Sequence, residues 1–516
     1  MRTVTGRTDH VVVVGAGLAG LSTALHLLGA GRTVTVLERG SVAGGRMGRL
    51  EVDGFRIDTG PTVLTMPALF DEALGAVGRS LADMVTLTRL DPAYRARFAD
   101  GSHIDVHTDP AAMEAELADK AGPATARGYR ELRAWLTELY DLQIGRFIGA
   151  NFDSPLDMVG SAAARSELLA LVRLGGFARL GSRVASYLPD ERAQRLFSFQ
   201  ALYAGLAPRS ALGAYGVIAY MDTIGGVYFP QGGMHAVAAA LADAATGAGA
   251  TLRLNTEVTG LRRNPAGDRV TAVHTADGDA IACDAVVLTP DLPLIDMLLG
   301  RPHRRRVGMR WSPSCVVMHG SVPSAVAGAW PQPAHHTIDF GAAWQTTFEE
   351  IIGGARAGAG RLMNDPSLLI TRPTHTDPTL APDGQQLCYI LAPCPNLESA
   401  PLDWDTLGPA YREELLAVLD ARGWLGIAEH FTPRDLLTPA DWARQGMAAG
   451  TPFSAAHTMS QTGPFRRGNM VAGLDNAVLA GCGTTPGVGV PTVLISGRLA
   501  AQRITGQQAS AAPAHG

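Results

Sequence analysis

The chain has 516 residues, and 43 Lys plus Arg against 48 Asp plus Glu give it a formal net charge of −5. A chain this close to neutral argues against a polycationic nucleic-acid binder, so we expect no nucleic acid among its partners. Charged residues make up 18% of the sequence and hydrophobic residues 46%, and so low a charged fraction predicts that something other than water covers part of the apolar surface.

The first 60 residues predict a β-α-β unit. Residues 10–14 form a β-branched run that is typical of a buried parallel strand. Residues 18–28 carry apolar side chains at helical spacing, and residues 33–37 form the second strand. We expect a further strand over residues 52–57.

An alternative interpretation of the N-terminus is a signal peptide. Arg2 and Arg7 precede an apolar run over residues 11–28, as the basic and apolar regions of such a peptide would. Gly15, Gly17 and Gly20 interrupt this run at the spacing of a known turn motif, which favours a strand, a turn and a helix over a signal peptide.

These glycines form a G-x-G-x-x-G motif at Gly15, Gly17 and Gly20, in the strand–turn–helix context that such a motif requires. Gly15 permits the tight turn, Gly17 lets the backbone approach a pyrophosphate, and Gly20 lets the helix pack on the strand. Glu38 follows the second strand and can accept hydrogen bonds from both ribose hydroxyls. The motif therefore predicts a dinucleotide site, and Glu38 favours FAD or NAD over NADP.

The residues after Glu38 favour FAD over NAD. Gly44, Gly45 and Arg46 come just past the acid, so this segment can fold back over the diphosphate. Arg46 would then add a bidentate positive charge to the field of the helix N-terminus. An NAD domain needs no such second clamp.

Residues 66–222 are expected to be mostly helical, with helices over 67–77, 110–117 and 124–142. The segment 162–188 differs because arginines alternate there with leucines and aromatic residues, and a Gly-Gly pair interrupts it. This pattern predicts a segment that lies in the interface of a bilayer, although a core helix with one solvated face is the alternative. The side chains we expect in the lipid are Leu171, Leu174 and Phe177.

An α/β pattern returns at residue 225. A glycine-rich stretch leads to a helix over 234–246, and three strands are expected over 251–261, 269–275 and 280–289. Residues 300–440 are mixed, and their elements cannot be ordered from the pattern.

The C-terminal segment predicts a strand over 477–480, a glycine-rich loop over 481–491 and a helix over 492–504. A helix N-terminus aimed at the N1–C2=O edge of a flavin would stabilise the anionic reduced form. The small polar tail that follows is expected to be disordered.

Several of these motifs together resemble the bacterial-type phytoene desaturase family of FAD-dependent oxidoreductases. They are V-V-V-V-G-A-G-L-A-G, L-E-R, A-G-G-R, D-T-G-P-T, G-G-V-Y-F-P-Q-G-G-M and L-A-G-C-G-T-T-P-G-V-G-V-P. The order and spacing of these motifs fit that family over nearly the whole chain. The match departs from the family's frequent residues at Cys482, Thr485 and Thr492, and these departures bear on which carotenoid is handled and in how many steps.

The resemblance implies an α/β fold with a discontinuous Rossmann domain of the glutathione-reductase type over 9–90, 225–295 and 450–505. A mixed α+β substrate domain would comprise 91–150 and 296–449. A helical, membrane-facing subdomain would cover 151–224, with a disordered tail over 506–516.

The resemblance also implies FAD as the cofactor, with Glu257 and Val258 contacting the adenine through backbone groups. The expected cofactor-binding residues are Gly15, Gly17, Leu18, Ala19, Gly20, Glu38, Arg39, Gly44, Gly45, Arg46, Gly60, Pro61, Thr62, Val258, Gly481, Gly483, Val490 and Pro491.

The implied activity is desaturation of phytoene or a related acyclic carotenoid, by hydride transfer to flavin N5 with loss of a proton from the adjacent carbon. A flavin-containing carotenoid isomerase or carrier and an amine or porphyrinogen oxidase are the alternatives. No catalytic residue is assigned, because Asp222, His235, His335 and His336 are candidates by residue type alone. No metal site is expected.

The expected partners are an apolar polyene, a membrane lipid surface, and quinone or oxygen as electron acceptor. Nicotinamide is not expected as acceptor, because the sequence holds one dinucleotide motif and no second one. The five cysteines are odd in number and form no C-x-x-C pair, which favours free thiols in a reducing compartment. With no apolar window of 18 residues, we expect a cytoplasmic protein held peripherally at the inner face of the cell membrane.

Overall fold

A five-stranded parallel sheet carries the glycine motif at its centre. The computed structural model describes residues 1–301, 308–330, 334–353 and 359–507. The expected tail over 506–516 lies outside these residues from position 508 onward. The sheet has the strand order β10-β2-β1-β14-β20. Its strands are β1 (His10–Val14), β2 (Thr33–Leu37), β10 (Thr251–Arg253), β14 (Ala285–Leu288) and β20 (Ala477–Leu479).

The two faces of this sheet are covered differently, and the valines of β1 show the division. Val11 and Val13 belong to one apolar core with α1 (Leu18–Gly29), α10 (His235–Gly247) and α17 (Val490–Thr505). Val12 and Val14 belong to another core, which an antiparallel three-stranded sheet covers. Because successive strand residues point to opposite faces, an unbroken valine run fills both cores. The covering strands are β11 (Val258–Arg263), β12 (Val270–Thr275) and β13 (Ala280–Ala282).

Three expected strands are each divided in two, so their predicted bounds were wrong. The run 251–261 leaves the parallel sheet at Asn255, where φ is +52°, and continues as β11 in the covering sheet. The run 280–289 likewise joins both sheets, as β13 and β14. The run 52–57 is part of a hairpin that turns at Asp53 and Gly54, with β3 (Arg49–Val52) and β4 (Phe55–Asp58) as its strands. An apolar pattern does not reveal which sheet a strand joins, and the short connections over 254–257 and 283–284 do not end the pattern clearly.

A second large sheet forms the other half of the molecule, with the order β19-β15-β18-β17-β16-β7-β8. Two of its strands come from the region 66–222, which is mostly helical as expected but also contains these strands, which the sequence did not predict. All neighbours in this sheet are antiparallel except β7 and β16. Its strands are β7 (Tyr94–Phe98), β8 (His103–Val106), β15 (Ser314–Pro323), β16 (His336–Phe340), β17 (Leu368–Thr371), β18 (Gln385–Cys394) and β19 (Thr432–Leu437). An apolar core joins residues of β15, β17 and β18 to residues of α14 (Trp404–Ala421).

The expected helical segments are confirmed with small shifts of their ends. Other elements of the first 230 residues include β5 (Leu64–Thr65), α2 (Pro67–Gly75), β6 (Leu87–Arg89), α4 (Pro110–Ala121), α5 (Pro123–Gln143), α6 (Ala162–Arg173), α7 (Leu180–Tyr187), α9 (Gly216–Thr223) and β9 (Val227–Pro230). The Gly-Gly pair in 162–188 does separate two helices, because it falls between α6 and α7.

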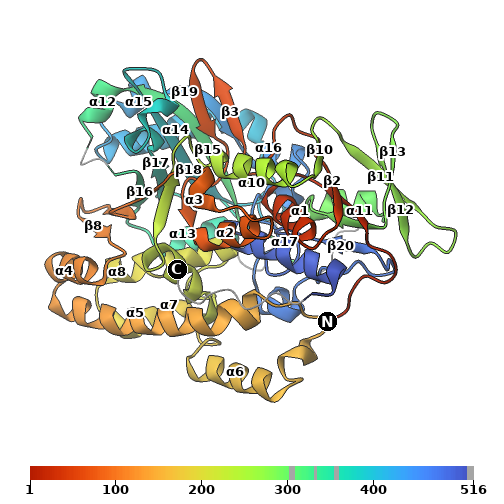
Figure 1. The fold of residues 1–516 in the computed structure, drawn as a ribbon. Coiled ribbons are helices and arrows are strands. Elements are labelled where there is room, and N and C mark those ends of the chain that lie inside the picture. The colour runs from red at the N-terminus through yellow and green to blue at the C-terminus, as the bar shows by residue number, and fades with distance from the viewer. Residues whose placement is uncertain (302–307, 331–333, 354–358, 508–516) are drawn as a thin grey trace.

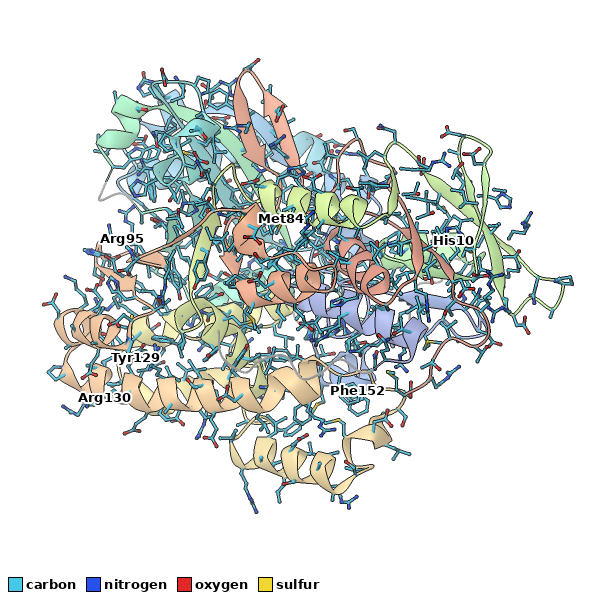
Figure 2. All side chains as sticks on the ribbon, in the orientation of Figure 1. His10, Met84, Arg95, Tyr129, Arg130 and Phe152 are labelled. Carbon is cyan, nitrogen blue, oxygen red and sulfur yellow. The ribbon has the colours of Figure 1, made fainter. Side chains whose placement is uncertain are left out.

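In Figure 1, α6 lies at the lower margin of the molecule, below α5 and away from the parallel sheet. Figure 2 labels Tyr129 and Arg130 on α5, and Phe152 in the segment that follows the opposite end of this helix and leads to α6. Among the residues that the structure describes, no helix is both long and apolar enough to cross a membrane.

Candidate functional site

One cavity of about 1030 Å³ joins the carboxyl ends of the parallel strands to the second sheet and the helical region. Four parallel strands each deliver a lining residue just past their last residue: Gly15 after β1, Glu38 after β2, Thr289 after β14 and Gly481 after β20. Ligands of open α/β sheets bind at this edge. The cavity is lined by all of the expected cofactor-binding residues except Gly20 and Gly483.

The glycines of the motif have two different roles. A Cβ at Gly20 would lie 2.0 Å from the Gly15 carbonyl oxygen, so Gly20 is required by the packing of α1 on β1. A Cβ at Gly17 would instead have the Gly45 Cα, 3.8 Å away, as its nearest neighbour. The protein itself therefore leaves room for a side chain at Gly17, and a glycine there keeps open a cradle that a ligand can fill.

Two nearby backbone amides hold the Glu38 side chain in place. Its carboxylate accepts hydrogen bonds from the Ala16 and Gly40 amides, both at 2.8 Å. These bonds hold the side chain beside the glycine turn, and its remaining lone pairs are free to accept from ribose hydroxyls. Arg39, next to it, donates to the Gln445 carbonyl at 2.8 Å and so links the two halves of the molecule.

The segment 44–46 folds back on the glycine motif, as the sequence predicted. The Gly44 amide donates to the Ala16 carbonyl at 2.8 Å, and Gly44 and Gly17 form a parallel bridge. Arg46 donates to Asp291 at 2.6 Å and to the Cys482 sulfur at 3.4 Å. The buried Arg46 Nε has no hydrogen-bond partner within the described residues.

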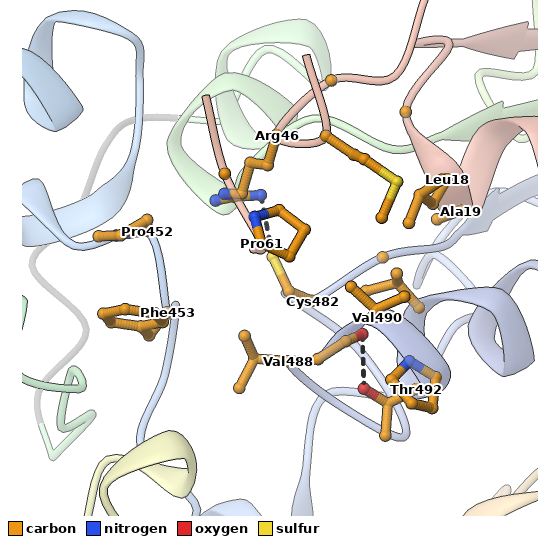
Figure 3. Close-up of a pocket in the computed structure, with 18 of the residues that line it drawn as sticks. Leu18, Ala19, Arg46, Pro61, Pro452, Phe453, Cys482, Val488, Val490 and Thr492 are labelled. Carbon is orange, nitrogen blue, oxygen red and sulfur yellow. Dashed lines mark hydrogen bonds between the residues drawn. The ribbon is translucent and has the colours of Figure 1, made fainter. Parts of the chain in front are cut away.

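Asp291 is a site residue that the sequence reasoning missed. It lines the cavity and holds the Arg46 guanidinium by an ion pair, so only part of that group remains to face a diphosphate. A signal for it existed, because an acid two residues after an expected parallel strand falls at the ligand-binding edge. Figure 3 shows Pro61 and Cys482 beside Arg46, with the hydrogen bond from Arg46 to Cys482 as a dashed line.

The D-T-G-P-T segment connects the cradle to the second sheet. A Cβ at Gly60 would lie 1.8 Å from the Arg46 carbonyl oxygen, so this position tolerates only glycine. The Thr62 hydroxyl accepts a hydrogen bond from the Thr371 hydroxyl of β17 at 3.0 Å. Pro61 and Thr62 both line the cavity.

The N-terminus of α17 faces the cavity. The helix begins at Val490, two residues before the expected start, and Val490, Pro491 and Thr492 all line the cavity. The Thr492 hydroxyl turns back to donate to the Gly489 carbonyl at 2.9 Å (Figure 3). The first-turn amides have no partner within the helix, so this end presents a partial positive charge. Gly483 lies outside the cavity wall, where a Cβ would meet Leu292 at 3.0 Å.

The far end of the cavity is apolar. Helical segments supply Phe147, Met158, Ile218 and Met221, the turn after α6 supplies Phe177, and the second sheet supplies Val317, Leu369 and Leu391. Asp222 and Tyr203 lie among these side chains.

Of the histidines considered from sequence, only His336 lines the cavity. His235 contacts the Ala43 carbonyl at 3.0 Å, and His335 contacts the Thr376 hydroxyl at 2.7 Å. Burial lowers the pKa of His335 to about 3 and that of His336 to about 4, so both rings are neutral at pH 7. His235 and His335 therefore have structural roles.

The polar end of the cavity fits a flavin dinucleotide on three observations: the open cradle at Gly17, the fixed carboxylate of Glu38 and the helix N-terminus at Val490. The expected adenine neighbours also line it, with Val258 buried and Glu257 exposed.

Comparison with known proteins agrees with this geometry. Residues 18–505 match the family described as flavin containing amine oxidoreductase. A phytoene dehydrogenase of Streptomyces griseus is 61% identical over 515 residues, which cover 99% of this chain and 98% of that protein. A zeta-carotene-forming phytoene desaturase of Myxococcus xanthus is 32% identical, over 96% of this chain and 93% of that protein. An oxidoreductase from Methanosarcina mazei has the same fold, with a TM-score of 0.58 and 16% identity over 95% of this chain and 99% of its own.

Proposed function

The chain belongs to the flavin-containing amine oxidoreductases, and within them to the phytoene desaturases, and from this premise we propose that it desaturates phytoene or a related acyclic carotenoid. Its cofactor is FAD. Bound FAD supplies the hydride acceptor for the oxidation of a CH–CH group. The residues that would hold it are those of the polar end: the glycine cradle, Glu38, Arg46 and the first turn of α17.

The observation that carries this proposal is the continuity of one cavity from a polar dinucleotide cradle to an apolar end. A hydrocarbon offers no group for a hydrogen bond or an ion pair, so its binding depends on apolar contact and on exclusion of water. The far end of the cavity supplies such contact through aliphatic and aromatic side chains from α9, α6 and the second sheet.

The apolar end also has a mouth at the protein surface, and this supports access from a membrane. Seven large apolar side chains that are between 39% and 73% exposed come from α6 and from neighbouring segments that contact it or one another, and we call this group the apolar mouth. Phe177, Met459 and Phe465 are both exposed and part of the cavity wall, so the cavity opens among them. The apolar mouth consists of Leu156, Val159, Leu169, Val172, Phe177, Met459 and Phe465.

The membrane-facing residues expected from sequence need correction. Leu171 is buried and packs into the main core, and Leu174 is half-buried with its carbonyl bonded to the Trp135 indole at 2.9 Å. The neighbours Leu169 and Val172 are exposed instead, at 47% and 52%. We propose that α6 lies on the bilayer through these residues and that the exposed Arg165, Arg173 and Arg179 meet anionic headgroups.

We also propose a location, an electron acceptor and a domain division for the chain. The chain would work as a peripheral protein on the cytoplasmic face of the membrane. The reduced cofactor would be reoxidised by a quinone that arrives through the lipid, or by oxygen. The chain would divide into the FAD, substrate and helical units expected from sequence, which is supported by the pairing of β7 with β16 inside the second sheet.

Flotation with anionic vesicles tests the membrane contact. Leu169→Ser, Val172→Ser and Phe177→Ser together should release the protein from vesicles while its FAD content stays unchanged. Leu425→Ser is the matched control, because Leu425 is 58% exposed and lies outside the apolar mouth. Unchanged flotation of the triple variant would contradict α6 as the anchor.

Expression in a host that makes phytoene tests the activity itself. New carotenoids with longer conjugated systems are expected, and unchanged phytoene would contradict the proposal. Anaerobic turnover in liposomes then identifies the acceptor: repeated turnover is expected with added quinone, and repeated turnover with NAD⁺ or NADP⁺ alone would contradict a quinone or oxygen acceptor.

A further inference from the structure

We propose that Asp222 is the catalytic base that removes the proton from the substrate during desaturation, an inference that rests on the proposed function. Asp222 lies in the last turn of α9 and lines the apolar end of the cavity. Ile218, one helical turn earlier, lines the same wall, so the carboxyl lies on the face of α9 that the substrate would contact.

The Asp222 carboxyl has no hydrogen bond or ion pair within the described residues. The other acidic residues that line the cavity either have hydrogen-bond or ion-pair partners or are exposed at the dinucleotide end. Glu38 accepts two backbone hydrogen bonds, and Asp291 pairs with Arg46 at 2.6 Å. Asp435 accepts from the Leu436 amide at 2.9 Å and lies 3.7 Å from a His319 ring nitrogen. Glu257 is exposed at the dinucleotide end.

The surroundings of Asp222 give its carboxylate the strength of a base. Burial without a compensating charge raises the pKa of Asp222 to about 7. Its position at the C-terminal end of a helix also disfavours a negative charge. The titratable groups near it are the phenols of Tyr94 and Tyr203, from β7 and the short helix Phe199–Ala204, and the pKa of each lies well above its ordinary value. α5 and β9 also pack against α9, and neither brings a cation to this carboxyl in the described part of the chain.

His336 is the competing base, because it lines the same cavity. Its Nδ1 is engaged with the Thr371 hydroxyl at 2.7 Å. Burial lowers the pKa of His336 to about 4, so a proton on this ring is held about a thousandfold less tightly than one on Asp222. A base works best when its pKa lies near the working pH, which favours the aspartate.

Bound FAD would supply the two-electron oxidant, by taking a hydrogen with its electron pair from one sp³ carbon of the substrate. The C–H bond on the adjacent carbon breaks, its electron pair becomes the second bond of the new alkene, and its proton bonds to an Asp222 carboxylate oxygen. Tyr203, whose ring lines the cavity beside this carboxyl, helps to exclude water during the transfer. The proton leaves Asp222 for solvent before the next step.

The test compares Asp222→Asn and Asp222→Glu with the wild type in phytoene-containing liposomes. We expect kcat for Asp222→Asn to fall at least a hundredfold with FAD content and KM preserved, and Asp222→Glu to recover part of the rate. In the wild type, kcat/KM should fall tenfold per pH unit below about pH 7, because protonated Asp222 cannot accept a proton. In Asp222→Asn this pH dependence should disappear.

Asp141→Asn is the matched control, because Asp141 lies exposed on α5 and outside the cavity wall, and its rate should equal that of the wild type. A direct measurement does not depend on activity. The infrared carbonyl band of a protonated carboxylic acid should titrate near pH 7 in the wild type and be missing from Asp222→Asn.

Wild-type rates in Asp222→Asn, or loss of the pH dependence in His336→Gln instead, would overturn the assignment. These outcomes are distinct from failure of the proposed function, in which the wild type itself would leave phytoene unchanged. If the wild type is inactive on phytoene, an infrared band that does not titrate near pH 7 would still overturn the inference on its own.

Discussion

The two ends of the cavity are built in different ways. At the dinucleotide end, backbone amides, glycines and two acids are placed by turns that directly follow parallel strands. At the apolar end, side chains converge from α9, from α6 and from the second sheet, which are far apart in the sequence. Ligand binding at the dinucleotide end depends on local backbone geometry, so adding one methylene group there can decide whether a ligand enters. Ligand binding at the apolar end depends on the total apolar contact area, so single substitutions there are tolerated.

The largest expected effect is at the dinucleotide end. Gly17→Val places a branched side chain in the open cradle, so FAD binding should be abolished and the purified protein should be colourless. Its apoprotein should unfold at the same temperature as wild-type apoprotein, because no protein atom obstructs a Cβ there. Gly20→Ala should instead destabilise the apoprotein by about 3 kcal/mol, because its Cβ meets the Gly15 carbonyl oxygen. A yellow Gly17→Val protein would contradict the role of this cradle.

This contrast also explains what could be predicted from sequence. The cradle was predictable because each of its residues lies within a few positions of a strand end, and periodicity locates strand ends. Asp291 also follows a strand end, but its ion pair with Arg46, 245 residues away, could not be predicted because such a pairing leaves no local signal. The seven-stranded sheet was missed because its strands come from positions 94 to 437, and their pairing leaves no local signal. For the same reason the sequence could not distinguish the buried Leu171 from the exposed Leu169.

A second prediction concerns how far the buried Asp222 carboxylate lowers the free energy of unfolding. The unfolded chain releases the Asp222 proton near pH 4, whereas the folded state holds it to about pH 7. Between these values the folded state carries one more proton, so the free energy of unfolding falls as the pH rises. Asp222→Asn removes this penalty. It should stabilise the protein by about 4 kcal/mol at pH 8 and leave it nearly unchanged at pH 4, measured by urea unfolding at saturating FAD. Equal stabilisation at both pH values would contradict a raised pKa.

A third prediction separates packing from membrane contact on one helix. Leu171→Ser should lower the free energy of unfolding by about 3 kcal/mol, because this side chain is buried in the main core. Leu169→Ser, two residues earlier, should change it by less than about 0.5 kcal/mol and should weaken vesicle binding. Chemical unfolding and flotation on both variants measure this. Equal destabilisation by Leu171→Ser and Leu169→Ser would contradict the packing of the Leu171 face of α6 against the main core.

A smaller effect is expected at Arg46. Arg46→Gln removes a charge-assisted donor from the cradle and should weaken FAD binding about tenfold to a hundredfold, measured by quenching of flavin fluorescence. It also leaves Asp291 without its ion-pair partner. Adding Asp291→Asn should therefore restore part of the FAD affinity. If the double variant binds FAD no better than Arg46→Gln, then repulsion between the unpaired Asp291 and the FAD diphosphate does not contribute to the loss of FAD affinity.

Anaerobic mixing of the purified yellow protein with phytoene in liposomes shows directly whether one cavity brings a hydrocarbon to the flavin. We expect the flavin absorbance to bleach, with one new carbon–carbon double bond for each flavin reduced. Carotenoid isomerisation without net bleaching, or an unchanged flavin spectrum at saturating phytoene, would contradict this expectation.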